Sequence, residues 1–193
     1  MYRHRRSITV ICFGIFFHAC VFAQPYAASP TITLLSRTYH LGSFNPKPQA
    51  MWEFVSAGES VTGWTTLLTL IDRPDAHTQQ ELDRLAEGIK SNYESHGGKI
   101  LKAQTMRDAS GAPYNYMVVA FEEPAKHRFE LNFVKAALSP KNAYVVVYGV
   151  RITDPKDYLG KAKAFLNQHS GEVGRALENA SLPDFSKLPR TEF

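Results

Sequence analysis

Four strand-like segments follow one another between residues 99 and 150, and the short connections between them strongly constrain the fold. The segments are KILKAQTM (99–106), YNYMVVAFE (114–122), HRFELNFVKA (127–136) and AYVVVYGV (143–150). The turn-forming sequences DASGAP, EPAK and SPKN lie between them. Connections this short join antiparallel neighbours, because a parallel pair needs a longer crossover. The last segment is apolar almost throughout, which predicts a strand buried on both faces in the middle of the sheet.

Further strands are expected upstream of these four. MWEFV (51–55) alternates, with Trp52 and Phe54 on one face, which is the period of a strand. After the turn SAGES, the segment WTTLLTLID (64–72) is rich in β-branched and aromatic residues and predicts a neighbouring strand. ITLLSRTYHL (32–41) is a candidate first strand with an irregular pattern.

Residues 78–96 change to a helical period. Thr78 and Glu81 form a capping box, in which each side chain accepts a hydrogen bond from a free backbone donor of the other residue. Gly97 and Gly98 end the segment. The residues at helical spacing, which predict one buried face, are Leu82, Leu85, Ala86, Ile89 and Tyr93.

A second helix is expected after the last strand. Asp154 is the expected N-cap, Pro155 the first helical residue, and Asp157 lies near the positive end of the helix dipole. Gly171 and Gly174 are expected to weaken its later turns. Its packing face is expected to consist of Tyr158, Leu159, Ala162, Phe165, Leu166, Val173 and Leu177.

The order of elements predicts an α+β fold: a single domain with an antiparallel sheet of about six strands packed with two helices. The expected organisation is a signal peptide (1–23), an N-terminal arm (24–49), the α+β domain (50–180) and a mobile C-terminal tail (181–193). A domain of this size can be stabilised by its hydrophobic core without disulfides.

The first 23 residues have the three parts of a secretory signal peptide. A basic start is followed by an apolar run, Ile8–Phe22, which is too short for a span of about 20 residues, and by a cleavage site after Ala23. Two alternatives are a twin-arginine signal at Arg5-Arg6 and lipidation at Cys20. The pattern predicts export to the periplasm or the medium.

Cleavage changes the charge and removes both cysteines. Loss of three arginines lowers the 22 basic residues of the whole chain to 19, against 18 acidic ones. The mature charge therefore gives no reason to expect nucleic acid or an anionic membrane as a partner. Because Cys12 and Cys20 both lie in the leader, the mature chain has no disulfide, zinc-thiolate site or cysteine nucleophile.

Three stretches carry a resemblance to a known superfamily. DASGAPYNYMVVAFEE, AKHRFELNFVKA and KNAYVVVYGVRITDPKDY resemble the second half of the PsbP and Mog1-like α/β/α sandwich superfamily. The resemblance spans residues 50–178 at the level of element order. It implies this sandwich fold and a non-catalytic binding or assembly role, as in photosystem assembly or small-GTPase regulation, but it identifies no binding residues.

The sequence offers no catalytic, metal or cofactor site. The five mature histidines are not spaced three or four residues apart, and neither an HExxH nor a GxSxG motif occurs. Gly97-Gly98 follows a helix rather than preceding one, which is wrong for a phosphate loop. Glu122 and Glu123 point in different directions beside a turn, so a charged loop is favoured over an acid/base pair.

Strand 127–136 contains a row of polar groups. Arg128, Glu130 and Asn132 lie on one face of this strand. The residues on the opposite face are His127, Phe129, Leu131 and Phe133. The row has two interpretations, a solvent-facing half of the sheet or a recognition surface.

The aromatic residues also have two interpretations. Trp52 and Trp64 are expected to pack in the core, or else to line a partly open pocket together with Tyr114 and Tyr116. The first hypothesis for function is an exported, non-enzymatic interaction module of the bacterial envelope or secretome that binds a protein partner. The second is a carrier of a small apolar ligand or lipid, and the third is a hydrolase that uses His127.

Overall fold

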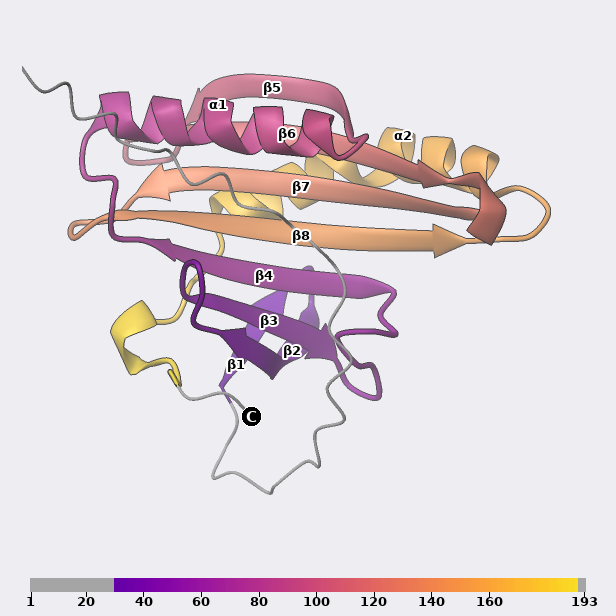
Figure 1. Ribbon diagram of the computed structural model, residues 1–193, viewed down its shortest axis with the longest axis horizontal. Helices are drawn as coiled ribbons and strands as arrows, with labels where there is room; N and C mark the ends of the chain where they lie inside the picture. The colour runs from indigo at the N-terminus through magenta and orange to yellow at the C-terminus, as the bar shows by residue number, and fades with distance from the viewer. Residues whose placement is uncertain (1–29, 191–193) are drawn as a thin grey trace, which may run out of the picture.

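The computed structural model describes residues 30–190 and shows one antiparallel sheet with a helix on each face (Figure 1). The sheet has eight strands in the order β1-β2-β3-β4-β8-β7-β6-β5. The strands are β1 (Thr31–Leu34), β2 (Arg37–Asn45), β3 (Met51–Ser56), β4 (Thr66–Arg73), β5 (Lys99–Arg107), β6 (Pro113–Glu123), β7 (Arg128–Leu138) and β8 (Ala143–Thr153). The helices are α1 (Gln79–Ser95) and α2 (Tyr158–Glu178), with short 3₁₀ turns η1 (Pro124–Lys126) and η2 (Phe185–Lys187). The expected signal peptide, residues 1–23, lies outside the described residues.

The expected sheet of about six strands is wrong, because the sheet has eight. The segment 32–41 is not one irregular strand but most of a hairpin, in which β1 pairs with β2. Leu35 and Ser36 form its two-residue turn, with φ angles of 51° and 59°. Such turns need positive φ at both positions and are usually built from Asn-Gly or Gly-Gly, so Leu-Ser gives no turn signal.

The hairpins of the second half follow the sequence pattern. β5, β6, β7 and β8 pair in chain order, each antiparallel to the next. β8 lies between β7 and β4 in the interior of the sheet. Val145 and Val147 face one core, and Val146 and Tyr148 face the other, so this strand is buried on both faces as its composition predicts.

The two faces of the sheet carry separate hydrophobic cores. On the α1 face, Leu82 and Leu85 of α1 pack with Val119 and Val134. On the α2 face, the core joins residues of α2, of the central strands and of the β1–β2 hairpin: Ile32, Tyr39, Trp52, Leu70, Phe133, Tyr148, Val173 and Leu177. α1 packs on β5, β6 and β7, whereas α2 packs on β7 and β8, so both helices cover the same half of the sheet from opposite sides (Figure 1).

Both helices begin at side-chain caps, but one cap differs from the expected residue. The capping box of Thr78 and Glu81 is present at α1. At α2 the cap is Asp157, which accepts from the backbone N–H of Gly160, and not Asp154. Asp154 instead accepts from the N–H groups of Lys156 and Asp157. It therefore shapes the turn that precedes the helix.

The segment after α2 is packed against the sheet up to the last described residue. Trp52 donates its indole N–H to the carbonyl of Pro189 at 2.6 Å, and the ring of Phe185 meets it edge-on at 5.7 Å. Leu188 is buried in the core of the α2 face. The expectation of a mobile tail therefore does not hold for residues 181–190.

Within residues 30–190, neither helix combines the length and the apolar character needed to cross a membrane.

Candidate functional site

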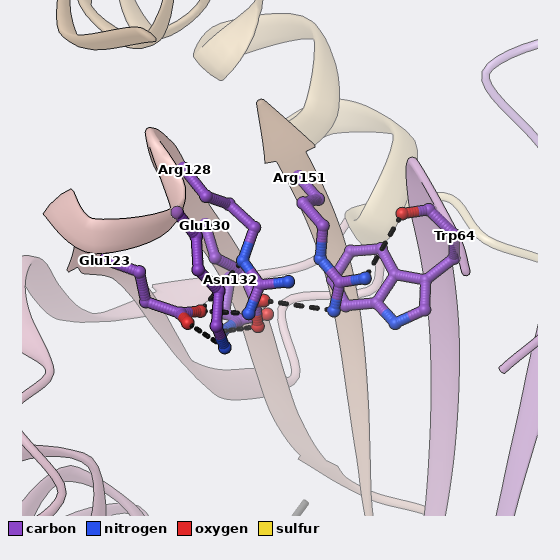
Figure 2. Close-up of polar contacts among 7 residues, drawn as sticks. Trp64, Glu123, Arg128, Glu130, Asn132 and Arg151 are labelled. Atoms are coloured by element: carbon purple, nitrogen blue, oxygen red, sulfur yellow. Dashed lines mark hydrogen bonds and ion pairs between the residues drawn. The ribbon is translucent and has the colours of Figure 1, made fainter. Parts of the chain in front are cut away.

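Figure 2 shows the polar row of β7. The row lies on the same face as Val134, which belongs to the core of the α1 face, and it is largely buried. Glu130 and Asn132 are 9% and 7% exposed, and the Arg128 side chain is 20% exposed. The row is therefore not a solvent-facing half of the sheet. Its groups need partners, because burying a charge without one is costly.

Those partners come from the strands on either side of β7. Arg128 lies opposite Glu123 of β6 and donates from Nε to its Oε1 at 2.8 Å. Glu130 lies opposite Arg151 of β8, with 3.5 Å between Oε2 and the guanidinium. Asn132 donates its amide to Glu130 Oε1, also at 3.5 Å. Two arginines and two glutamates thus neutralise one another across three strands.

Trp64 completes this cluster from the loop before β4. The Arg151 guanidinium lies 3.8 Å from the centre of the indole ring and donates to the Trp64 carbonyl at 3.5 Å (Figure 2). Gly149 makes the approach possible, because a Cβ there would lie 3.1 Å from the indole. Such a stacked cation contributes of the order of 1 kcal/mol. The cluster therefore ties the loop before β4 to β8 and β7.

The electrostatics of the cluster follow from its burial. Burial lowers the pKa of Arg151, while the charge of Glu130 opposes this shift. Although burial acts to raise it, the pKa of Glu123 is lowered, because Lys126 and Arg128 donate hydrogen bonds to its carboxylate. Burial also raises the pKa of Tyr93 on α1, and the charge of Glu130 adds to that rise. Each acid of the cluster is paired with an arginine of a neighbouring strand.

Arg151 is the member of the cluster that the sequence pattern missed. It follows the apolar run of β8, and only the register of β7 with β8 brings it opposite Glu130. Its Nε is buried and has no hydrogen-bond partner within residues 30–190. The one available signal in the sequence was a charged residue directly after the apolar run 143–150.

The four aromatic residues considered as pocket walls do not line one space. Trp52 lies on β3, and Tyr114 and Tyr116 lie on β6, with β4, β8 and β7 between them. These three belong to the core of the α2 face, whereas Trp64 stacks with Arg151 on the α1 face. All four are buried by their own neighbours.

A groove of about 450 Å³ lies between the β7–β8 turn and the segment after α2. Tyr144 and Phe185 form part of its wall. Asp72 also lines it and already accepts hydrogen bonds from Asn142 at 2.6 Å and Arg190 at 3.3 Å. The Asp72 carboxylate in the groove is therefore engaged within the chain.

The outer edge of β5 is the most exposed part of the sheet. β5 has a neighbouring strand on one side, and all its residues except Ile100 and Met106 are exposed. Leu101 of this strand is 42% exposed. The sequence signal for an edge strand is the near absence of an apolar face in KILKAQTMR, since a strand covered on a face carries one.

The hydrogen-bonding pattern shows which backbone groups of β5 point outward. Asp108 donates its N–H to the carbonyl of Ala112, across the turn to β6. Alternate residues of an antiparallel strand bond to the same neighbour. The N–H and C=O groups of Ala103, Thr105 and Arg107 therefore face away from β6 and are open to another strand.

Within residues 30–190, no three His, Asp or Glu side chains are arranged to hold a metal ion. No family model matches the chain, and a search of the curated proteins finds no match. The resemblance to the PsbP and Mog1-like superfamily stays a prediction.

Proposed function

We propose that this protein is an exported, non-enzymatic interaction module of the bacterial envelope or secretome, and that it binds a protein partner by strand addition along β5. The observation that carries the proposal is the exposed outer edge of this nine-residue strand. An extended peptide that pairs with such an edge gains main-chain hydrogen bonds, and pockets or charges beside the edge select its side chains. The leader pattern of residues 1–23 supports export, and accessory, immunity-type and effector roles fit equally well.

In this proposal, the polar cluster around Arg128, Glu130 and Asn132 stabilises the sheet and does not contact the partner. Its charges are paired within the sheet, so a partner would have to break buried ion pairs to reach them. The edge of β5 requires no such cost, because its outward backbone groups are already exposed to water.

Affinity capture with matched baits tests the proposal. The bait spans residues 24–193, which contain all eight strands and both helices, and is exposed to envelope and secreted fractions. The variant Ala103→Pro removes one outward N–H without removing a hydrogen bond to β6, and Ala103→Val keeps that donor. A stoichiometric partner should be retained by the wild type and Ala103→Val and lost from Ala103→Pro. Equal retention by all three baits would refute strand addition at β5.

The carrier of a small apolar ligand or lipid is the second candidate, and the groove beside Tyr144 and Phe185 is the observation in its favour. Native mass spectrometry of the gently purified chain distinguishes the two functions. A bound mass of lipid or metabolite size would support the carrier, and a clean apo mass would argue against it.

A further inference from the structure

The exposed edge strand carries positive charge alone. Lys99, Lys102 and Arg107 lie within β5, and the strand contains no Asp or Glu. Within residues 30–190, neither lysine takes part in an ion pair; Lys102 instead lies over the ring of Tyr116, with 5.7 Å from Nζ to the ring centre. The charges of Lys99 and Lys102 are therefore available to a segment that pairs with β5.

A bulge in β5 brings the two lysines into consecutive positions on one face. Lys99 lies opposite Ala120 and Lys102 opposite Val118, because the register shifts between Ile100 and Lys102. Ala120 and Val118 are two residues apart and both face the α2 side. Lys99 and Lys102 are therefore same-face neighbours along the α2 side of the edge, as residues i and i+2 are in a regular strand. Without the bulge, a spacing of three would place them on opposite faces.

We propose that the segment bound along β5 is an extended acidic strand with carboxylates at positions i and i+2, which face Lys99 and Lys102. This inference rests on the proposed function and names the chemistry of the partner. Carboxylates on alternate residues lie on the same face of a strand and match the spacing of the two lysines. The bulged residue Leu101, which is exposed, offers an apolar contact between the two charged positions.

A second copy of this chain fits the edge less well. Pairing of two β5 strands would bring six cations together with no acid on either strand. Like charges on facing strands are destabilising, and lysines on an edge are a common defence against such self-pairing. The same lysines attract an acidic strand, so the edge discriminates by charge.

Selection from a displayed library of random ten-residue peptides tests the proposal. The library is selected on residues 24–193 of the wild type, on Ala103→Pro and on the double variant Lys99→Glu/Lys102→Glu, each checked for folding by circular dichroism. Peptides enriched on the wild type should carry Asp or Glu at i and i+2 among β-branched residues. The double variant, in which both charges are reversed, should bind these peptides roughly tenfold more weakly. Selection on it should enrich Lys or Arg at the same positions.

The three targets separate failure of the partner chemistry from failure of strand addition. Peptides that lose binding to Ala103→Pro, yet lack the acidic pattern and bind the charge-reversed variant equally, would overturn the acidic partner and leave strand addition standing. Peptides that bind Ala103→Pro as well as the wild type would overturn strand addition itself. Enrichment of peptides identical to the β5 sequence would replace the acidic partner by a second copy of the chain.

Discussion

Glu53 shows how a single side chain makes this fold depend on pH. It is partly buried on the α1 face of β3 and accepts a hydrogen bond of 2.6 Å from the Ser43 hydroxyl. Burial raises the pKa of its carboxyl above the ordinary value, and the bond from Ser43 opposes the rise. The folded chain therefore holds this proton at pH values where the unfolded chain has released it, so the contribution of Glu53 to stability decreases as pH rises through that interval.

Glu53→Gln should therefore stabilise the fold at neutral pH and give no gain below the pKa of the unfolded carboxyl. Glutamine keeps an acceptor for Ser43 without a charge to desolvate. Urea unfolding at pH 3.5 and pH 7.5 measures the difference. The matched variant Ser43→Ala should lower stability more at pH 7.5 than at pH 3.5, since it removes the bond that favours the charged form. A gain for Glu53→Gln that is equal at both pH values would contradict this account.

The polar row shows what residue patterns can and cannot predict. Alternation along residues 127–136 correctly places Arg128, Glu130 and Asn132 on one face. It does not supply their partners, because Glu123 and Arg151 meet them only through the pairing of β7 with β6 and β8. A row of polar residues was therefore predictable, and its burial within a charged network was not.

At the scale of elements, local signals predicted the second half of the sheet and α1 well. Short polar turns and alternating runs identify β5 to β8, and the capping box of Thr78 with Glu81 identifies the start of α1. The prediction failed where the chain uses an uncommon local solution. The β1–β2 hairpin was missed because its turn is built from Leu35 and Ser36, which are not typical turn residues. The N-cap of α2 is Asp157, although Asp154 is an equally plausible cap by sequence.

The uncommon turn between β1 and β2 should be a place where stability can be gained. Ser36 is exposed and has a φ of 59°, which costs a non-glycine residue about 1 kcal/mol or more. Ser36→Gly should raise the free energy of unfolding by about 1 kcal/mol, because glycine adopts positive φ without strain. Chemical denaturation followed by circular dichroism measures it.

Ser36→Ala is the control for this variant, since alanine retains the strain and should give no gain. A lower free energy of unfolding for Ser36→Gly than for Ser36→Ala would mean that the turn is not strained as its φ angles indicate.

At the scale of the whole molecule, both ends of the described chain contribute residues to the same hydrophobic core. The β1–β2 hairpin and the segment after α2 both add residues to the core of the α2 face. That core reaches from Ile32 to Leu188, so the fold is complete only when the last segment is in place. The sequence pattern missed this, because SLPDFSKLPR has no regular period and its few apolar residues resemble those of a loop.

Removal of residues 181–193 should therefore lower stability by about 3 kcal/mol and expose Trp52. The variant loses buried Leu188, the ring contact of Phe185 and the hydrogen bond from Trp52 to Pro189. In a Trp64→Phe background, which leaves Trp52 as the only tryptophan, the emission of the folded protein should shift to longer wavelength. A chain that ends at Arg190 keeps the described contacts and is the control. Unchanged emission after the longer truncation would contradict the packing of this segment.

The way α2 is attached to the sheet determines which of its positions can be substituted during evolution. Lys135 is buried on β7, and its Nζ donates to the main-chain carbonyls of Leu177 (3.1 Å) and Glu178 (3.0 Å), at the last turn of the helix. Carbonyl groups are present whatever side chain the residue carries, so this attachment survives substitution on the helix but not on the strand. Among homologues, position 135 should therefore keep a lysine or arginine, while position 178 should accept many residue types.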